Sequence, residues 1–227
     1  MELSSLNINF ASVMPEMLLT GLALLVLIVD FFLAPKNKAA LGYLSIIGLL
    51  CILPVAALTV HADPSFGGTV ISDAYSAYFN VIFIVAAIFA IFISMDYLKK
   101  TGIQKGEYYH ITLFATVGMM VMASANDLIN LYVGLELMAL SFYILVAFRT
   151  ASSRSVEGAL KYFVLGALSS GILLYGIAFA YGASGSTNLN EIASGLGTTN
   201  SSYLLLGFIL IIAAVFILYA HYSYLFP

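Results

Sequence analysis

The stretch that decides the fold runs from Asp127 to Tyr181 and contains two apolar segments that each carry a charge. The first reads Asp127-Leu-Ile-Asn-Leu-Tyr-Val-Gly-Leu-Glu136-Leu-Met-Ala-Leu-Ser-Phe-Tyr-Ile-Leu-Val-Ala-Phe148. The second begins Glu157-Gly-Ala-Leu-Lys161-Tyr-Phe and continues through Gly166-Ala-Leu-Ser-Ser-Gly171 to Tyr181. Each segment is long enough to cross a membrane as a helix. An ionised group inside such a helix costs about 2.5–3.5 kcal/mol on insertion scales, so Glu136 and Lys161 are candidate functional residues.

The composition is that of a polytopic membrane protein. Of the 227 residues, 62% are hydrophobic and 8% are charged, whereas about 25% of the residues of a soluble domain are charged. The apolar runs are continuous, which excludes the alternating segments of about 10 residues that are typical of a membrane β-barrel. The single cysteine, Cys51, cannot form an internal disulfide, and no Cys/His spacing resembles a metal site. No basic patch indicates nucleic acid.

Hydropathy predicts an all-α fold, a polytopic transmembrane bundle of about seven helices that forms a single domain over residues 1–227. The expected spans are about 14–33, 41–60, 74–95, 108–125, 127–148, 156–181 and 203–225. Basic residues outside the spans occur only in the first, third and fifth connections: Lys36, Lys38, Lys99, Lys100, Lys105, Arg149 and Arg154. The positive-inside rule assigns these connections to the cytoplasm and the N-terminus to the outside.

Glu136 lies nine residues after Asp127, about 14 Å along a helix that rises 1.5 Å per residue. That depth is close to the midplane of a hydrocarbon core about 30 Å thick. A short carboxylate cannot reach the interface from there, so it must be protonated, paired or facing water inside the bundle. The leading interpretation is a proton-transfer group, and the alternative is a neutral Glu that is hydrogen-bonded to a neighbouring helix.

Lys161 lies roughly 9 Å inside its span, and its long side chain can reach the interface. Glu157, four residues earlier, is a ready partner on the same helix, so Lys161 is either a functional intramembrane charge or part of a local ion pair. The two spans run antiparallel, and Glu136 and Lys161 differ in height by roughly 9 Å. That separation is too large for a firm salt bridge but small enough for coupling through water or a polar side chain. Asp127 and Glu157 are possible supporting residues.

Two further features of the apolar spans predict packing and anchoring. Glu16 and Asp30 lie near opposite ends of the first span, where anchoring at the membrane interface is the expected role. The pairs Gly166/Ser170 and Ala167/Gly171 have small residues four apart, and such spacing predicts the close approach of another helix backbone.

With these residues the sequence resembles subunit N of the proton-pumping NADH-quinone oxidoreductase. The resemblance is carried by residues 130–145 around Glu136 and 157–176 around Lys161, by the continuation 181–189, and by Pro15-Glu16 with Asp30. It covers residues 10 to about 212. Gly134-Leu135-Glu136 and Lys161-Tyr-Phe-Val-Leu-Gly-Ala favour subunit N over the related subunits L and M and over cation/proton antiporters.

The resemblance implies an antiporter-like, proton-translocating membrane subunit with no redox centre of its own. NADH, flavin, iron–sulfur clusters and quinone would belong to partner subunits of the complex. Glu136 matches the family's intramembrane glutamate at the boundary with the neighbouring subunit, and Lys161 matches the lysine partnered with it. The implied partners are the other membrane-arm subunits, the lipid bilayer and protons, and the implied location is a bacterial inner membrane.

After about residue 213 the chain departs from the family's pattern. The family continues with a lysine, Pro-Phe-His and a Trp-x-Pro-Asp motif before a second set of helices, whereas this chain reads Val215-Phe216-Ile-Leu-Tyr-Ala-His221. The tail resembles the product of a truncation or a frameshift. We therefore expect either the N-terminal half of a proton-translocating subunit or a truncated, non-pumping scaffold or fragment of it. An independent cation/proton antiporter is a third alternative, which the contexts of Glu136 and Lys161 disfavour.

Overall fold

Seven long helices dominate the structure, a computed structural model that describes residues 8–34, 37–103, 105–195 and 201–225. The helices are α1 (Met14–Phe32), α2 (Ala39–Leu58), α3 (Ala74–Lys100), α4 (Glu107–Ala123), α5 (Leu128–Val146), α6 (Ser153–Ser184) and α8 (Ser201–Leu225). A 3₁₀ helix, η2 (Phe10–Val13), precedes α1, and a short helix, α7 (Leu189–Ser194), follows α6. Lys36 and the side chain of His221 lie outside the described residues.

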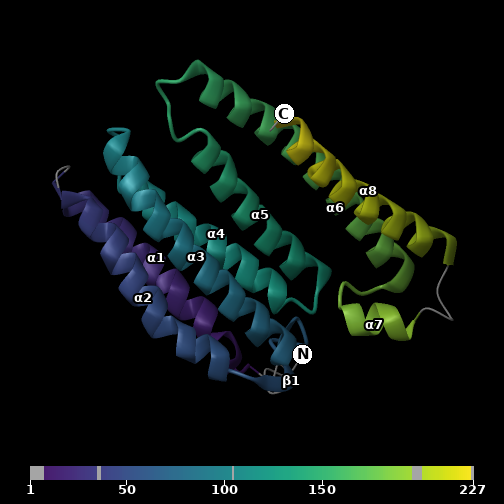
Figure 1. Cartoon of the computed structure of the whole chain (residues 1–227). Coiled ribbons are helices and arrows are strands. Elements are labelled where there is room, and N and C mark those ends of the chain that lie inside the picture. The colour runs from purple at the N-terminus through teal and green to yellow at the C-terminus, as the bar shows by residue number, and fades with distance from the viewer. Residues whose placement is uncertain (1–7, 35–36, 104, 196–200, 226–227) are drawn as a thin grey trace.

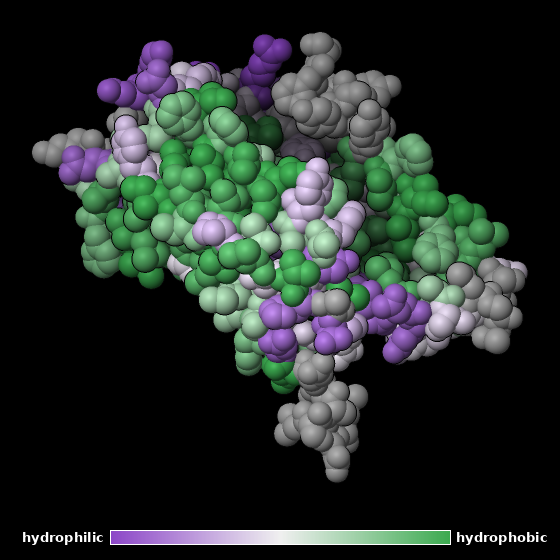
Figure 2. Space-filling view, turned by 60° about the horizontal axis from the view of Figure 1, so that its bottom comes forward, coloured by the Kyte–Doolittle hydropathy of each residue, from purple (hydrophilic) through white to green (hydrophobic). Residues whose placement is uncertain are grey.

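The helices have the length and surface of membrane-spanning segments. Five of those in the described part of the chain are long and apolar enough to cross a bilayer: Phe10–Phe32, Ala39–Leu58, Ala74–Lys100, Leu128–Val146 and Ser153–Ser184. Large apolar side chains such as Phe31, Leu58 and Ile93 are exposed on their surfaces. Figure 2 shows apolar residues over most of one face, with hydrophilic residues gathered towards its edges. The prediction of a helical, multi-pass membrane fold is confirmed, while its description as one transmembrane domain stays a prediction.

A small antiparallel hairpin is the exception to the all-α prediction. Strands β1 (His61–Ser65) and β2 (Val70–Ser72) fill the connection between α2 and α3. Their turn has three successive residues with positive φ, Phe66 (53°), Gly67 (67°) and Gly68 (86°), a conformation that favours glycine. The hairpin lies at the same end of the bundle as the N-terminal part of α1 (Figure 1).

The helices form two groups with α5 between them (Figure 1). One apolar core joins α1 to α4 and includes Leu19, Leu49, Ile84, Leu113 and Met120, all fully buried. A second core joins the start of α5 to α6, α7 and α8: Leu128, Leu173, Ile177, Ala180, Ile192, Leu204 and Ala214. Helix α5 therefore carries its polar residues along the boundary between two packed groups.

Glycines set the closest helix crossings, but they are not the ones that the small-residue pairs predicted. A Cβ on Gly118 of α4 would lie 2.6 Å from the carbonyl oxygen of Gly134 on α5. A Cβ on Gly176 of α6 would lie 2.8 Å from the carbonyl oxygen of Gly207 on α8. By contrast, Gly171 has open space beside it, so the prediction of a backbone approach there was wrong.

The three basic connections meet at one end of the bundle. Lys38 forms an ion pair with Asp30 at 2.9 Å, and a Cβ on Gly106, which precedes α4, would collide with that aspartate. The ammonium group of Lys105 lies 5.9 Å from the centre of the ring of Phe148, two residues after the end of α5. The first, third and fifth connections therefore share one side, as the charge pattern requires.

Candidate functional site

Glu136 is partly buried on α5, and its partner comes from α6. Its Oε1 accepts a hydrogen bond from the hydroxyl of Ser170, a residue that is only 8% exposed. The Ser170 hydroxyl lies 3.1 Å from the hydroxyl of Tyr132, one turn before Glu136 on α5. Three polar side chains are therefore linked in a row in the apolar boundary between α5 and α6. The hydrogen bond to Ser170 of a neighbouring helix fits both interpretations of Glu136, so its proton-transfer role stays a prediction.

The same face of α5 continues the row of hydroxyl groups. Tyr132, Glu136 and Tyr143 are spaced by four and seven residues, which places them on one helix face. The hydroxyl of Tyr143 packs against Gly166 of α6, where any Cβ would collide with it. Its ring meets that of Tyr162 edge to face, with 4.7 Å between the centroids. We call these five residues, Tyr132, Glu136, Tyr143, Tyr162 and Ser170, the hydroxyl seam.

Sequence reasoning found Glu136 but not the rest of the seam. Ser170 was expected to provide space for a helix backbone, whereas it provides a hydrogen bond to Glu136. The spacing of Tyr132 and Tyr143 around Glu136 is the signal that would have located the seam. A tyrosine four or seven residues from Glu136 is on the same face of the helix as the carboxyl, so it points into the bundle and not towards the membrane interface.

Lys161 pairs with its helix neighbour and does not reach Glu136. Its Nζ lies 2.5 Å from Oε1 of Glu157, and the two side chains are 63% and 64% exposed. Lys161 lies nine residues before Ser170, so the backbone positions of the two residues are about 14 Å apart along α6. The local ion pair with Glu157 is the arrangement that the structure adopts, and the functional role of Lys161 stays a prediction.

Asp127 begins α5 and joins three connections at one end of the bundle. Its Oδ1 accepts from the backbone N–H of Ile129 at 2.8 Å, which caps the helix, and its Oδ2 accepts from the Thr187 hydroxyl at 2.6 Å. Nearby, the side-chain amides of Asn126 and Asn188 both donate to the carbonyl oxygen of Gly68 in the hairpin turn: Asn126 at 2.8 Å and Asn188 at 2.7 Å. We call these residues, Gly68, Asn126, Asp127, Thr187 and Asn188, the end clamp. With all these partners, Asp127 fixes where α5 begins and therefore the height of Glu136.

The two acids of α1 lie in the α1–α4 group. Asp30, 7% exposed, pairs with Lys38. Glu16, also 7% exposed, points into the bundle and accepts from the amide of Asn80 on α3 at 3.2 Å. The expected anchoring of Glu16 at the membrane interface is therefore not what its side chain does.

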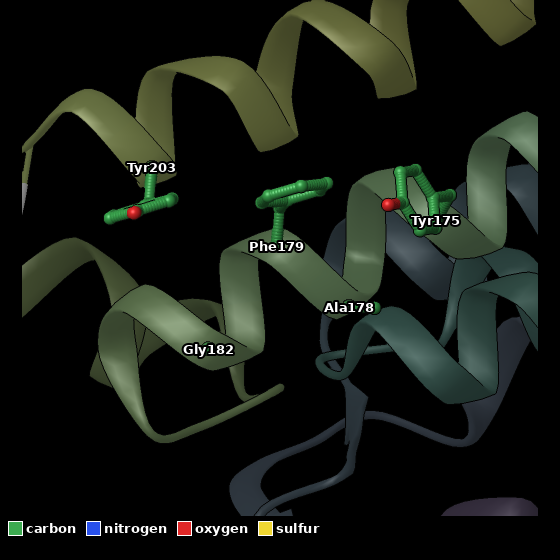
Figure 3. A pocket seen from close by; sticks show the side chains of 5 residues that line it. All are labelled: Tyr175, Ala178, Phe179, Gly182 and Tyr203. Carbon is green, nitrogen blue, oxygen red and sulfur yellow. The ribbon is translucent and has the colours of Figure 1, made fainter.

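An apolar pocket of about 370 Å³ opens between α6 and α8, away from Glu136. Its lining residues are Tyr175, Ala178, Phe179, Gly182 and Tyr203 (Figure 3). The rings of Phe179 and Tyr203 stack with an interplanar angle of 11°. The pocket offers no charged side chain to orient a substrate. Within the described residues, no group of three or more His, Cys, Asp or Glu side chains is placed to hold a metal ion.

Comparisons with known proteins identify close relatives of this sequence. The family described as NADH:quinone oxidoreductase/Mrp antiporter, transmembrane, matches residues 125–223. The chain is 41% identical over 211 residues to NADH-quinone oxidoreductase subunit N of Trichlorobacter lovleyi, covering 91% of this chain and 43% of that protein. It is 40% identical over 199 residues to subunit N of Moorella thermoacetica, covering 87% of this chain and 42% of that protein. The chain thus spans less than half the length of these relatives.

Solved structures show the same fold. Respiratory complex I from Thermus thermophilus with bound aureothin matches with a TM-score of 0.69 and 27% identity, over 88% of this chain and 42% of that chain. The membrane-bound sulfane sulfur reductase, an archaeal respiratory membrane complex, matches with a TM-score of 0.68 and 24% identity, over 88% of this chain and 43% of that chain.

Proposed function

Because this chain is a homologue of NADH-quinone oxidoreductase subunit N over nine tenths of its length, we propose that it is a membrane-arm subunit of respiratory complex I that takes part in proton translocation. In this proposal the partners are the other membrane-arm subunits in a bacterial inner membrane, with the basic connections on the cytoplasmic side. Electron transfer from NADH through flavin and iron–sulfur clusters to quinone takes place in partner subunits.

The link between Glu136 and Ser170 is the observation that carries the proposal. A carboxyl group within an apolar span is costly, and packing alone would be served by leucine. The hydroxyl of Ser170 donates to an ionised carboxylate and, after rotation, accepts from a protonated one. Glu136 thus keeps a hydrogen-bond partner in both protonation states, which suits a group that loads and releases a proton.

In this proposal, two tyrosines of the hydroxyl seam carry the coupling between Glu136 and Lys161. Tyr143 and Tyr162 lie between them on facing helices, in edge-to-face contact. In the proposed cycle, protonation of Glu136 is coupled to a charge change at Lys161, which leaves its pair with Glu157. The proton then passes laterally to the neighbouring subunit. Lys161 and Glu157 are exposed on α6, so a partner subunit can reach them.

Glu136→Gln in the assembled complex tests the proposal. We expect NADH-driven proton pumping to fall while the complex still assembles, because glutamine keeps the shape and hydrogen bonds of a protonated Glu136 but carries no transferable proton. The matched control is Glu191→Gln, which removes an exposed carboxylate of α7 outside the seam and should leave pumping unchanged. Substitution of Lys161 should have a milder effect. Undiminished pumping in Glu136→Gln would remove this residue from the mechanism.

A non-pumping scaffold is the second candidate function. The close crossing of α4 and α5 and the end clamp both fix helices rigidly, as assembly alone would require. In that case the complex would need this chain for assembly, yet Glu136→Gln and Ser170→Ala would both pump normally. An independent antiporter would instead exchange cations for protons in vesicles that contain this chain alone.

A further inference from the structure

A second carboxyl, Glu16, is enclosed by α1, α3 and α4, away from the hydroxyl seam. Asn80 of α3 is 3% exposed, and its Nδ2 donates to Oε1 of Glu16 at 3.2 Å. The remaining oxygens of this pair, Glu16 Oε2 and Asn80 Oδ1, are buried and have no hydrogen-bond partner. Both are acceptors when the carboxyl is ionised, so neither can satisfy the other.

We infer that Glu16 and Asn80 form a proton-binding site, in which Glu16 is a neutral carboxylic acid that donates from Oε2 to Oδ1 of Asn80. One proton, taken up from water, gives both unpartnered oxygens a hydrogen bond, while Nδ2 continues to donate to Oε1. The same single proton is required if the Asn80 amide is flipped, so that its oxygen and nitrogen change places. The amide oxygen then faces one oxygen of the Glu16 carboxyl, and only a proton between these two oxygens gives them a hydrogen bond.

The other groups around Glu16 do not replace this proton. Two further donors lie near the carboxyl: the hydroxyl of Ser124, which caps the end of α4, and the backbone N–H of Glu16 itself. The Ser124 hydroxyl lies 3.2 Å from the carbonyl oxygen of Met120 and 3.4 Å from that of Val121, and neither donor comes within hydrogen-bond distance of Oε2. None of the ion pairs among the described residues includes Glu16. Glu16 lies in the first turn of α1, where the helix dipole favours an anion. That effect is small beside the cost of an unpaired buried charge.

The site lies near the end of the bundle where α1 begins. After Glu16, the inward face of α1 continues with Leu19, Ala23 and Val26, which are fully buried in the apolar core. Asp30, the next acid on this face, lies fourteen residues on, about 21 Å along the helix. The end where α1 begins, next to η2 and the hairpin, is therefore the nearer source of the proton.

Infrared difference spectroscopy of the full chain in lipid bilayers tests this assignment. We expect a protonated-carboxyl C=O stretch at neutral pH that shifts in D₂O and is lost in Glu16→Gln. Controls are Glu136→Gln and Glu191→Gln, which should leave the Glu16 band in place. A spectrum in this region that is the same in wild type and Glu16→Gln would show that Glu16 is ionised and would overturn the inference.

Thermal unfolding supplies an independent readout for the same pair. Glu16→Gln should keep the wild-type Tm, because a glutamine amide donates to Asn80 Oδ1 and accepts from Nδ2 just as the neutral acid does. Asn80→Leu should lower the Tm, because it leaves the Glu16 carboxyl without a partner. A lower Tm for Glu16→Gln than for Asn80→Leu would contradict the shared proton.

Discussion

Gly118→Ala tests the closest helix crossing of the structure. The added methyl group would lie 2.6 Å from the carbonyl oxygen of Gly134 and 2.6 Å from the backbone nitrogen of Met138, both on α5. Ordinary van der Waals contact begins at 3.4 Å, so the two helices would have to separate by about 0.8 Å. Both obstructing atoms belong to the main chain, and no side-chain rotation relieves the collision.

The expected penalty is that of overpacking, about 1–3 kcal/mol. Alanine is also more favourable than glycine inside a helix, by up to about 1 kcal/mol, and this gain offsets part of the overpacking penalty. The matched control is Gly171→Ala on α6, where an added Cβ meets nothing within 4 Å. The difference between the two variants isolates the collision. For a chain of this length it corresponds to a Tm lower by about 2–12 °C in Gly118→Ala.

The same displacement reaches the proposed proton site, because Glu136 follows Gly134 by only two residues. A misplacement of about 1 Å can cost a reaction about 100-fold, so pumping should fall more than stability alone explains. Thermal unfolding in lipid bilayers and NADH-driven pumping at a temperature where both variants are folded are the assays. Equal Tm values for Gly118→Ala and Gly171→Ala would refute the backbone contact between α4 and α5.

Three further predictions follow from neighbouring residues that differ in their partners. Ser170→Ala should reduce proton pumping, because it removes the donor to Glu136. Ser169→Ala removes a donor to the carbonyl oxygen of Ala214 on α8, so it should lower the free energy of unfolding by a similar amount, about 0.5–1.5 kcal/mol, without affecting pumping. Equal pumping in both variants would contradict the role of Ser170. Asp127→Ala should lower the free energy of unfolding by about 1–2 kcal/mol through loss of the α5 cap, while Asp127→Asn should retain most of it, which chemical denaturation can measure. Asp30→Ala breaks the largely buried ion pair with Lys38 and should lower the free energy of unfolding by about 3 kcal/mol. Asp96→Ala breaks the exposed ion pair with Lys100 and should lower it by less than about 0.5 kcal/mol. Similar losses in the two variants would contradict the burial of the Asp30 pair.

The helices and Glu136 could be predicted because their signals are local. A continuous apolar run of about twenty residues has few alternatives to a membrane-spanning helix. A carboxyl near the middle of such a run is unusual whatever surrounds it, so Glu136 is visible without knowledge of its partner. Ser170 cannot be identified in this way, because a serine in a membrane-spanning helix is equally well explained as a small packing residue.

The hairpin and the glycine crossings depend on residues far away in the sequence. Strand β2 is held by a hydrogen bond from the backbone N–H of Ile71 to the carbonyl oxygen of Ser124, at 2.9 Å, and its short length carries no clear alternation. Which glycines face another backbone depends on how each helix is rotated about its axis. Gly171 and Gly176 are both on α6, yet only Gly176 touches a backbone.

The placement of Glu136 limits how a charge change there can spread. Helix α5 is fixed at its first residue by the cap and partners of Asp127, and again at Gly134 by its contact with α4. Both restraints lie within nine residues before Glu136, so movement of the whole helix is an unfavourable response to protonation. Rotation of the Ser170 and Tyr132 hydroxyls moves no backbone and reverses the direction of the hydrogen bonds that link them to Glu136. A change in the protonation of Glu136 should therefore be taken up by these hydroxyl groups rather than by displacement of α5.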